Sequence, residues 1–245
     1  MRLHFYGTKG YVAESSKTHS GHSAFVVEAS GFRLLCDFGE NRKGMLERIR
    51  PDAIFVSHAH PDHGWGLWEG TDAPVYASSV THELLRELPL LDRRVLAPGE
   101  VAAVGPFRLA PQPVVHSIRC PCIGVRISLG AFTLVYSGDV VAFEDPDTAL
   151  AGADVYVGDG STLTESLVRR HHPSGVLIGH TTVRAQLGWL ARHGILRAVF
   201  SHFGRGPIEM GDEALTEALG KLAAATPPGC AVTAAYDGLE VEIGD

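Results

Sequence analysis

The sequence predicts an α/β fold in which strands form the inside of a layered structure. Short apolar runs typical of strands recur along the chain, and helical patterns stand between and after them. No linker, low-complexity tract or internal repeat interrupts the 245 residues, a length that one domain can fill. We therefore expect a single domain over residues 1–245.

The first half of the chain consists mainly of expected strands. Residues 53–56 are a short apolar run rich in β-branched and aromatic side chains, which indicates a buried strand. Helical patterns occupy 42–50, ending before Pro51, and also 63–69 and 79–88. The other expected strands are a hairpin over 23–28 and 32–36, followed by 101–104, 107–115, 123–129 and 132–136.

The second half alternates between the two kinds of element. The strongest helix is expected over 182–193, because Val183, Leu187, Leu190 and Ala191 recur at helical spacing. The other expected helices are 145–151, 162–170 and 212–225, and the expected strands are 155–157, 176–178, 197–201, 230–235 and 239–243.

Composition excludes several classes of protein. The formal net charge of −7 argues against a general binder of polyanions. No stretch approaches the roughly 18 apolar residues of a membrane span, and residues 1–7 lack the apolar region of a secretory signal. We therefore expect a cytoplasmic protein that binds no membrane and keeps its cysteines reduced. Cys120 and Cys122 are a pair of loop thiols to which the sequence assigns no role.

Four residues of metal-ligating types stand together where the buried strand ends. They are His58, His60, Asp62 and His63. Residues i and i+2 of an extended segment point the same way, so His58 and His60 can bind one cation. Asp62 and His63 follow the turn and point toward a second. Imidazole and carboxylate donors together suit Zn²⁺ or a similar borderline metal.

The motif His58-x-His60-x-Asp62-His63 resembles the signature of the metallo-β-lactamase superfamily of metallohydrolases. Four further segments match places where that superfamily carries site residues, and each places a His or Asp after an apolar strand. They are Leu34-Leu35-Cys36-Asp37-Phe38-Gly39, Val114-Val115-His116-Ser117, Tyr136-Ser137-Gly138-Asp139 and Val199-Phe200-Ser201-His202-Phe203-Gly204.

The resemblance implies a four-layer αββα sandwich that holds two divalent metal ions, with zinc favoured over manganese or iron. It implies a hydrolase whose nucleophile is a hydroxide bridging the two ions, and it counts Asp62 among the catalytic residues. Asp37 is expected to accept a ring N–H from a ligand histidine or to brace the motif loop. The implied ligands are His58, His60 and His116 for the first ion, Asp62, His63 and His202 for the second, and Asp139 as the bridge.

Two further segments resemble the RNase Z-like phosphodiesterase branch of that superfamily. Gly179-His180-Thr181-Thr182 precedes a helix and then the last ligand histidine, and Gly158-Asp159-Gly160-Ser161-Thr162 stands where the branch places an acidic residue before Thr. The resemblance makes His180 the general acid that protonates the leaving oxygen. Asp159 would orient this imidazole and help to charge it.

Other features depart from the tRNA-processing members of that branch. Their long tRNA-clamping arm is typically inserted between the third His and the bridging Asp, but only residues 117–138 separate His116 from Asp139 here. The net charge of −7 also disfavours neutralising many phosphates. We therefore expect a small or cyclic phosphodiester or an ester as the partner, and not tRNA. A homodimer is left open.

Other polar and aromatic residues near the motifs are weaker candidates. Arg205 and Arg119 are candidates for substrate contacts because each stands three residues after an expected ligand histidine, and His22 is a third candidate because its loop can fold over the metal cleft. We otherwise expect His19 and His22 to be exposed loop histidines. Trp65 and Trp68 are expected to pack in the core or to wall the pocket.

Two alternative functions stay open from the sequence. The first is hydrolysis of a thioester, lactone or other acyl substrate at the same site, because a fold does not fix its substrate. Such chemistry needs the pair of His180 and Asp159 less. The second is a metal-binding or redox-sensing protein without turnover, for which Cys120 and Cys122 near His116 would be the redox-active group.

Overall fold

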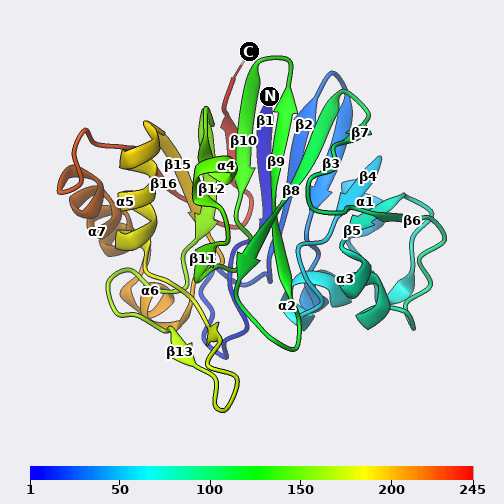
Figure 1. Cartoon of the computed structure of the whole chain (residues 1–245), viewed down its shortest axis with the longest axis horizontal. Helices are drawn as coiled ribbons and strands as arrows, with labels where there is room; N and C mark the ends of the chain where they lie inside the picture. The colour runs from blue at the N-terminus through cyan, green and yellow to red at the C-terminus, as the bar shows by residue number, and fades with distance from the viewer. Residues whose placement is uncertain (245) are drawn as a thin grey trace.

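The computed structural model of the chain describes residues 1–244 and contains two mixed β-sheets with helices outside them (Figure 1). The strands of the first sheet, in spatial order, are β17 (Glu240–Glu242), β1 (Arg2–Gly7), β2 (Ala24–Ala29), β3 (Phe32–Cys36), β4 (Ala53–Phe55), β5 (Val75–Ala77) and β6 (Arg93–Val95). Those of the second are β11 (Ala142–Phe143), β8 (Phe107–Val115), β9 (Cys122–Leu129), β10 (Phe132–Tyr136), β12 (Val155–Asp159), β15 (Arg197–Ser201) and β16 (Ala231–Ala234), with β7 (Ala102–Val104) also paired to β8. A separate hairpin pairs β13 (Arg169–Arg170) with β14 (Leu177–Ile178).

Helices lie on the two outer sides of the sheets. The α-helices are α1 (Leu46–Ile49), α2 (Pro61–Gly64), α3 (Ser79–Leu84), α4 (Pro146–Leu150), α5 (Val183–His193), α6 (Arg205–Met210) and α7 (Asp212–Ala224). Two 3₁₀-helices are η1 (Glu40–Arg42) and η2 (Trp65–Glu69). Figure 1 shows α5 and α7 beyond one sheet and α1 and α3 beyond the other. Within residues 1–244, no helix has the length and apolar character needed to cross a bilayer.

Strand periodicity explains why the sheets are covered on both faces. Leu34 and Cys36 of β3 lie in the core between the two sheets, while Leu35 points outward into the cluster under α1 and α3. On the second sheet, Val155 faces the core between the sheets, and Tyr156 packs in the cluster with α5 and α7. Successive side chains of a strand point to opposite faces, so both faces need a covering layer. The predicted four-layer αββα sandwich is confirmed.

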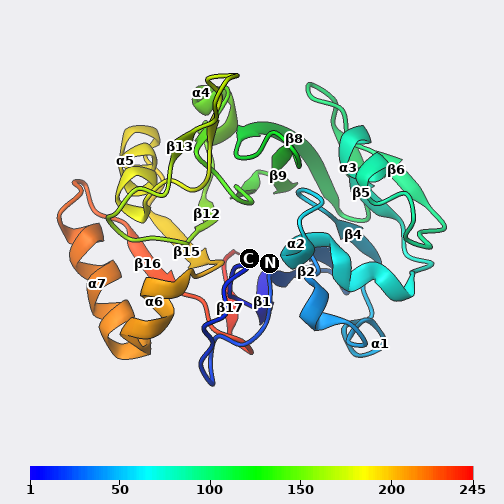
Figure 2. The same ribbon diagram turned by 90° about the horizontal axis from the view of Figure 1, so that it is seen from below.

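The functional edge of the sandwich follows from the parallel strands. In the first sheet β3 and β4 run parallel, and in the second β10, β12 and β15 run parallel. Parallel strands end at a common edge, so the loops after them meet there. Figure 2 views the molecule from below, with α2, which follows β4, facing α6, which follows β15.

The predicted helix over 162–170 is wrong. Its backbone groups pair instead with the segment that leads into the start of α5: Val183 N–H donates to the carbonyl of Thr162, and Leu167 N–H donates to that of His180. These tertiary partners replace the hydrogen bonds that an isolated helix would form. The predicted helices over 42–50 and 79–88 are shorter in the structure, where α1 and α3 occupy only part of each range.

Six elements were not anticipated, namely β1, β5, β6, β11, β13 and α6. The sequence carried a signal for β1, because Leu3 and Phe5 alternate with polar neighbours and are fully buried. By contrast, β5 and β6 are three residues long each, which is too short for a periodic pattern to stand out.

Candidate metal centre

The main motif spans the turn from β4 into α2. His60 is the residue before the helix, with extended backbone angles, and Pro61 occupies the first helical position. This backbone keeps His58 and His60 on the extended part and places Asp62 and His63 inside the helix. The change of direction at Pro61 divides the four side chains into two pairs, as the residue spacing predicts.

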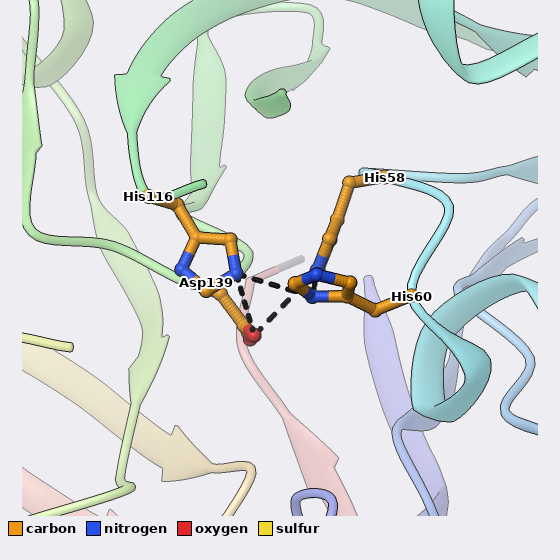
Figure 3. Close-up of side chains that lie close together, drawn as sticks. All are labelled: His58, His60, His116 and Asp139. Carbon is orange, nitrogen blue, oxygen red and sulfur yellow. Dashed lines mark hydrogen bonds and ion pairs between the residues drawn. The ribbon is translucent and has the colours of Figure 1, made fainter. Parts of the chain in front are cut away.

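The first group joins His58, His60, His116 and Asp139 (Figure 3). His58 Nε2 lies 2.8 Å from His60 Nδ1, and His116 Nε2 lies 3.3 Å from the same atom. Asp139 Oδ2 lies 3.6 Å from His58 Nε2 and 3.5 Å from His116 Nε2. Side chains that follow β4, β8 and β10 therefore converge on one point.

The second group joins Asp62, His63 and His202. Asp62 Oδ2 lies 3.7 Å from His63 Nε2 and 3.9 Å from His202 Nε2. The other oxygen of Asp139, Oδ1, lies 3.0 Å from His63 Nε2 and 3.3 Å from His202 Nε2. Asp139 thus presents one oxygen to each group, which is the geometry that a bridging carboxylate requires.

The electrostatics of the two groups differ. Burial and the neighbouring histidines lower the pKa of His58 well below its ordinary value, and burial lowers that of His60 to about 4, so both offer unprotonated nitrogens. Burial also lowers the pKa of His63, but Asp139, Asp62 and Asp37 outweigh it and raise the pKa well above its usual range. The second group is therefore an environment that favours positive charge.

Within residues 1–244, two buried atoms at the centre have no hydrogen-bond partner: His63 Nε2 and Asp139 Oδ1 lie 3.0 Å apart but do not form a hydrogen bond with each other. Leaving such atoms unsatisfied is costly, so their presence calls for an additional group. Neutral imidazoles and carboxylates are the donors that zinc and similar divalent ions prefer. The residues thus fit two divalent ions that share Asp139.

Hydrogen bonds behind the groups orient the rings. Asp37 Oδ2 lies 2.8 Å from His63 Nδ1 and accepts hydrogen bonds from Ser57 Oγ (2.7 Å) and the Tyr136 hydroxyl (2.6 Å), while Asp37 Oδ1 accepts from the Ser57 N–H. The structure places Asp37 where it both holds a ring and braces the motif loop. Such contacts fix the tautomer that leaves Nε2 for a metal.

Two further rings, those of His116 and His202, are held in the same way. His116 Nδ1 lies 3.0 Å from the carbonyl oxygen of Gly179, and His202 Nδ1 lies 2.8 Å from Ser23 Oγ. His202 and Asp37 both adopt left-handed backbone conformations, with φ of 58° and 55°. Non-glycine residues adopt such angles only where the surrounding structure imposes them, which is common at functional sites.

His180 and Asp159 form a pair at the mouth of the centre. His180 Nδ1 lies 2.8 Å from Asp159 Oδ2, and 22% of the His180 side chain is exposed, whereas Asp159 is buried. Burial lowers the pKa of His180, but Asp159 raises it to about 9. His180 also lies close enough to Asp139 and His202 to form a third group of metal-ligating type.

Gln186 supports this pair and was missed at the sequence level. Its Oε1 accepts the N–H of Asp159, and its Nε2 donates to the Asp159 carbonyl oxygen at 2.7 Å. Ser161 and Val140 N–H donate to the Asp159 carboxylate. The signal was a polar residue on the apolar face of the helix beginning at Val183, where a buried side chain needs polar partners.

A cleft of about 620 Å³ exposes the centre to solvent. The predicted site residues that line it are His60, Asp62, His116, Asp139, His180, His202 and Arg205. Arg205 Nε is paired with Glu209 at 2.9 Å and Glu14 at 3.3 Å. Neither Arg119 nor His22 is among the lining residues.

Four residues lie differently from the sequence-based expectation. His19 and His22 are buried rather than exposed, because residues 8–10 bond to Phe203 and bring their loop against the site. His19 packs edge-on against the Phe203 ring. Trp65 and Trp68 are exposed, at 41% and 56%, rather than packed in the core.

Comparison with known proteins agrees with this geometry. Residues 36–203 match the family model described as "Beta-lactamase superfamily domain". The chain belongs to this superfamily. The matched segment begins just before Asp37 and ends just after His202, so it contains all seven candidate ligands of the two metal groups.

Relatives and solved structures extend the comparison. The chain is 27% identical over 187 residues to a UPF0173 metal-dependent hydrolase of Opitutus terrae, covering 73% of this chain and 68% of that protein. It is 36% identical over 107 residues to a ribonuclease J of Sinorhizobium meliloti, but this match spans 38% of the chain and only 18% of the ribonuclease.

Among solved structures, the metallo-β-lactamase fold protein YhfI of Bacillus subtilis has a TM-score of 0.75 at 18% identity, covering 98% of each chain. A diphosphatase from the PhnP family has a TM-score of 0.71 at 20% identity, covering 98% of this chain and 97% of that one. At these identities the two structures show that the fold is shared.

Proposed function

We propose that this chain is a metal-dependent hydrolase that cleaves a small or cyclic phosphodiester. The observation that carries the proposal is the pair of His180 and Asp159 at the mouth of a centre with two groups of metal-ligating residues. The names of similar proteins, which include a metal-dependent hydrolase and a diphosphatase, support the reaction class. The net charge of −7 supports a small substrate over tRNA.

The residues divide the chemistry between them. Bound at the two groups, divalent ions would supply Lewis acidity and an activated water. In the hydrolysis, a new P–O bond forms as the bond to the leaving oxygen breaks, and that oxygen needs a proton. His180 can supply it from Nε2, because Nδ1 faces Asp159 and the carboxylate favours the protonated ring.

An alkyl phosphodiester expels an alkoxide, which departs poorly as an anion and needs the proton that this pair can supply, whereas the thiolate of a thioester leaves without one. The redox-sensing alternative receives no support from the thiols. Burial raises the pKa of Cys122 well above its usual range, and that of Cys120 is also raised by burial, so neither is an activated thiolate.

The test combines metal analysis with a comparison of two leaving groups. We expect about two transition metals per chain after mild purification. His180→Ala should retain both metals, lose on the order of 10²–10⁴-fold in kcat on an alkyl diester, and lose far less on a nitrophenyl diester. Equal losses on both substrates would remove His180 from the acid role. Loss of metal in this variant would instead make the ring a ligand.

A further inference from the structure

A second cavity, of about 570 Å³, opens beside His180. It shares His60, His116, Leu167 and His180 with the main cleft, so the two cavities meet at the proposed proton donor. Its lining does not include Asp62. A group that takes a proton from His180 can therefore extend into this second cavity.

The two cavities differ in charge. Carboxylates of Asp62, Asp139 and Glu165 line the main cleft. Among the described residues that line the second cavity, none carries a carboxylate, and Arg169 is the one Arg or Lys. The second cavity therefore offers a positive side chain and no carboxylate, which suits an anionic group on the substrate.

Arg169 has no competing partner within residues 1–244, because no ion pair or side-chain hydrogen bond links it to another described residue. It lies on β13 opposite Ile178 of β14, which lines the same cavity. The neighbouring Arg170 instead donates from Nη1 to the Gly175 carbonyl at 2.6 Å. Arg205 in the main cleft is already paired with two glutamates.

We propose that the cavity beside Arg169 binds the leaving-group half of the diester and selects a leaving group that carries its own phosphate. This inference rests on the proposed function, since it assigns the leaving side to His180. The guanidinium of Arg169 offers a planar set of N–H donors that matches a phosphate, and the absence of carboxylates from the lining leaves these donors free for it.

The test uses three diesters that differ only in the leaving phenol: methyl phenyl phosphate, methyl para-carboxyphenyl phosphate and methyl para-phosphonophenyl phosphate. We expect native protein to hydrolyse the phosphonate-bearing diester with the highest kcat/KM. Arg169→Ala should lower kcat/KM for this diester about 10-fold, mainly through KM, because Arg169 is solvent-exposed and its charged hydrogen bonds are partly screened. Activity on methyl phenyl phosphate should change less than about twofold.

Arg170→Ala is the matched control, because Arg170 lies on the same strand and does not line the cavity. It should leave all three rates unchanged. An unchanged preference in Arg169→Ala, or equal losses on the neutral and anionic diesters, would overturn the inference while leaving the proposed function intact. A carboxylate that substitutes fully for the phosphonate would overturn the choice of phosphate. If no diester is hydrolysed by metal-replete native protein, the proposed function fails, and the inference fails with it.

Discussion

Replacing Asp159 with asparagine removes the charge that faces His180 while keeping the size of the side chain. Although burial lowers the pKa of His180, the carboxylate 2.8 Å from Nδ1 raises it to about 9, against an ordinary value of 6.5. Without that charge burial becomes dominant, so we expect the pKa to fall to about 6.5 or below.

The sign of the effect follows from the role of the proton. A general acid works only while protonated, so activity is present below the pKa of His180 and is lost as pH rises through it. At about pH 8 the ring is roughly 90% protonated in the native protein and roughly 3% in Asp159→Asn, which predicts about a 30-fold lower kcat on an alkyl diester. At about pH 6, a variant pKa of about 6.5 predicts a difference under twofold, and a variant pKa further below 6.5 would enlarge the difference at both pH values.

The assay measures kcat against pH for native protein and Asp159→Asn at matched metal content, on an alkyl and a nitrophenyl diester. Nitrophenolate leaves without a proton, so its rate should barely change and serves as the internal control. Thermal unfolding checks that the variant folds. The asparagine amide has one oxygen in place of two, so the N–H of Ser161 or Val140 loses its acceptor, which should lower the free energy of unfolding by about 1–3 kcal/mol. The reasoning is refuted if the alkaline limb stays in place, or if both substrates respond equally.

Three further predictions concern the centre itself. Asp37→Ala removes the carboxylate that holds the His63 ring, so we expect metal affinity, measured by titration calorimetry, to fall about 10–100-fold. An unchanged affinity would exclude a role for Asp37 in orienting His63. Removing metal with a chelator should lower the unfolding temperature. Adding metal at about 100-fold over its Kd should restore about 2.7 kcal/mol of the free energy of unfolding. Identical melting curves with and without the chelator would count against resident ions. Gly39→Ala would place a Cβ 2.3 Å from that of His22 and 2.4 Å from the Asp62 carbonyl oxygen, so we expect a loss of roughly 1–3 kcal/mol in urea unfolding. A native-like free energy of unfolding in this variant would show that the loop moves to accommodate the added methyl group.

Local patterns in the sequence were sufficient to place most of the centre. His58, His60, Asp62 and His63 stand within one turn after an apolar strand, and the structure gathers them there. His116, Asp139 and His202 also follow apolar strands, and the strand order brings those ends to one edge. Such predictions succeed because strand periodicity and ligand type are both local properties.

Other features could not be predicted because they depend on distant contacts. The segment 162–170 reads as a helix, yet its backbone pairs with residues 180–184 and forms a wall of the cleft. His22 reads as a loop histidine, yet contacts between residues 8–10 and Phe203 bury its loop. In both cases long-range partners outweighed local propensity.

The sequence by itself determined the α/β class and the strand-end positions of the candidate ligands. Only the tertiary structure decided that the two oxygens of Asp139 face different groups, and that Tyr136 and Ser57 hold Asp37 behind His63. It also placed Arg169, rather than Arg119 or the paired Arg205, in a cavity beside His180. The physical reason is that residue type and spacing are local, whereas charge pairing and burial depend on which distant segments pack together.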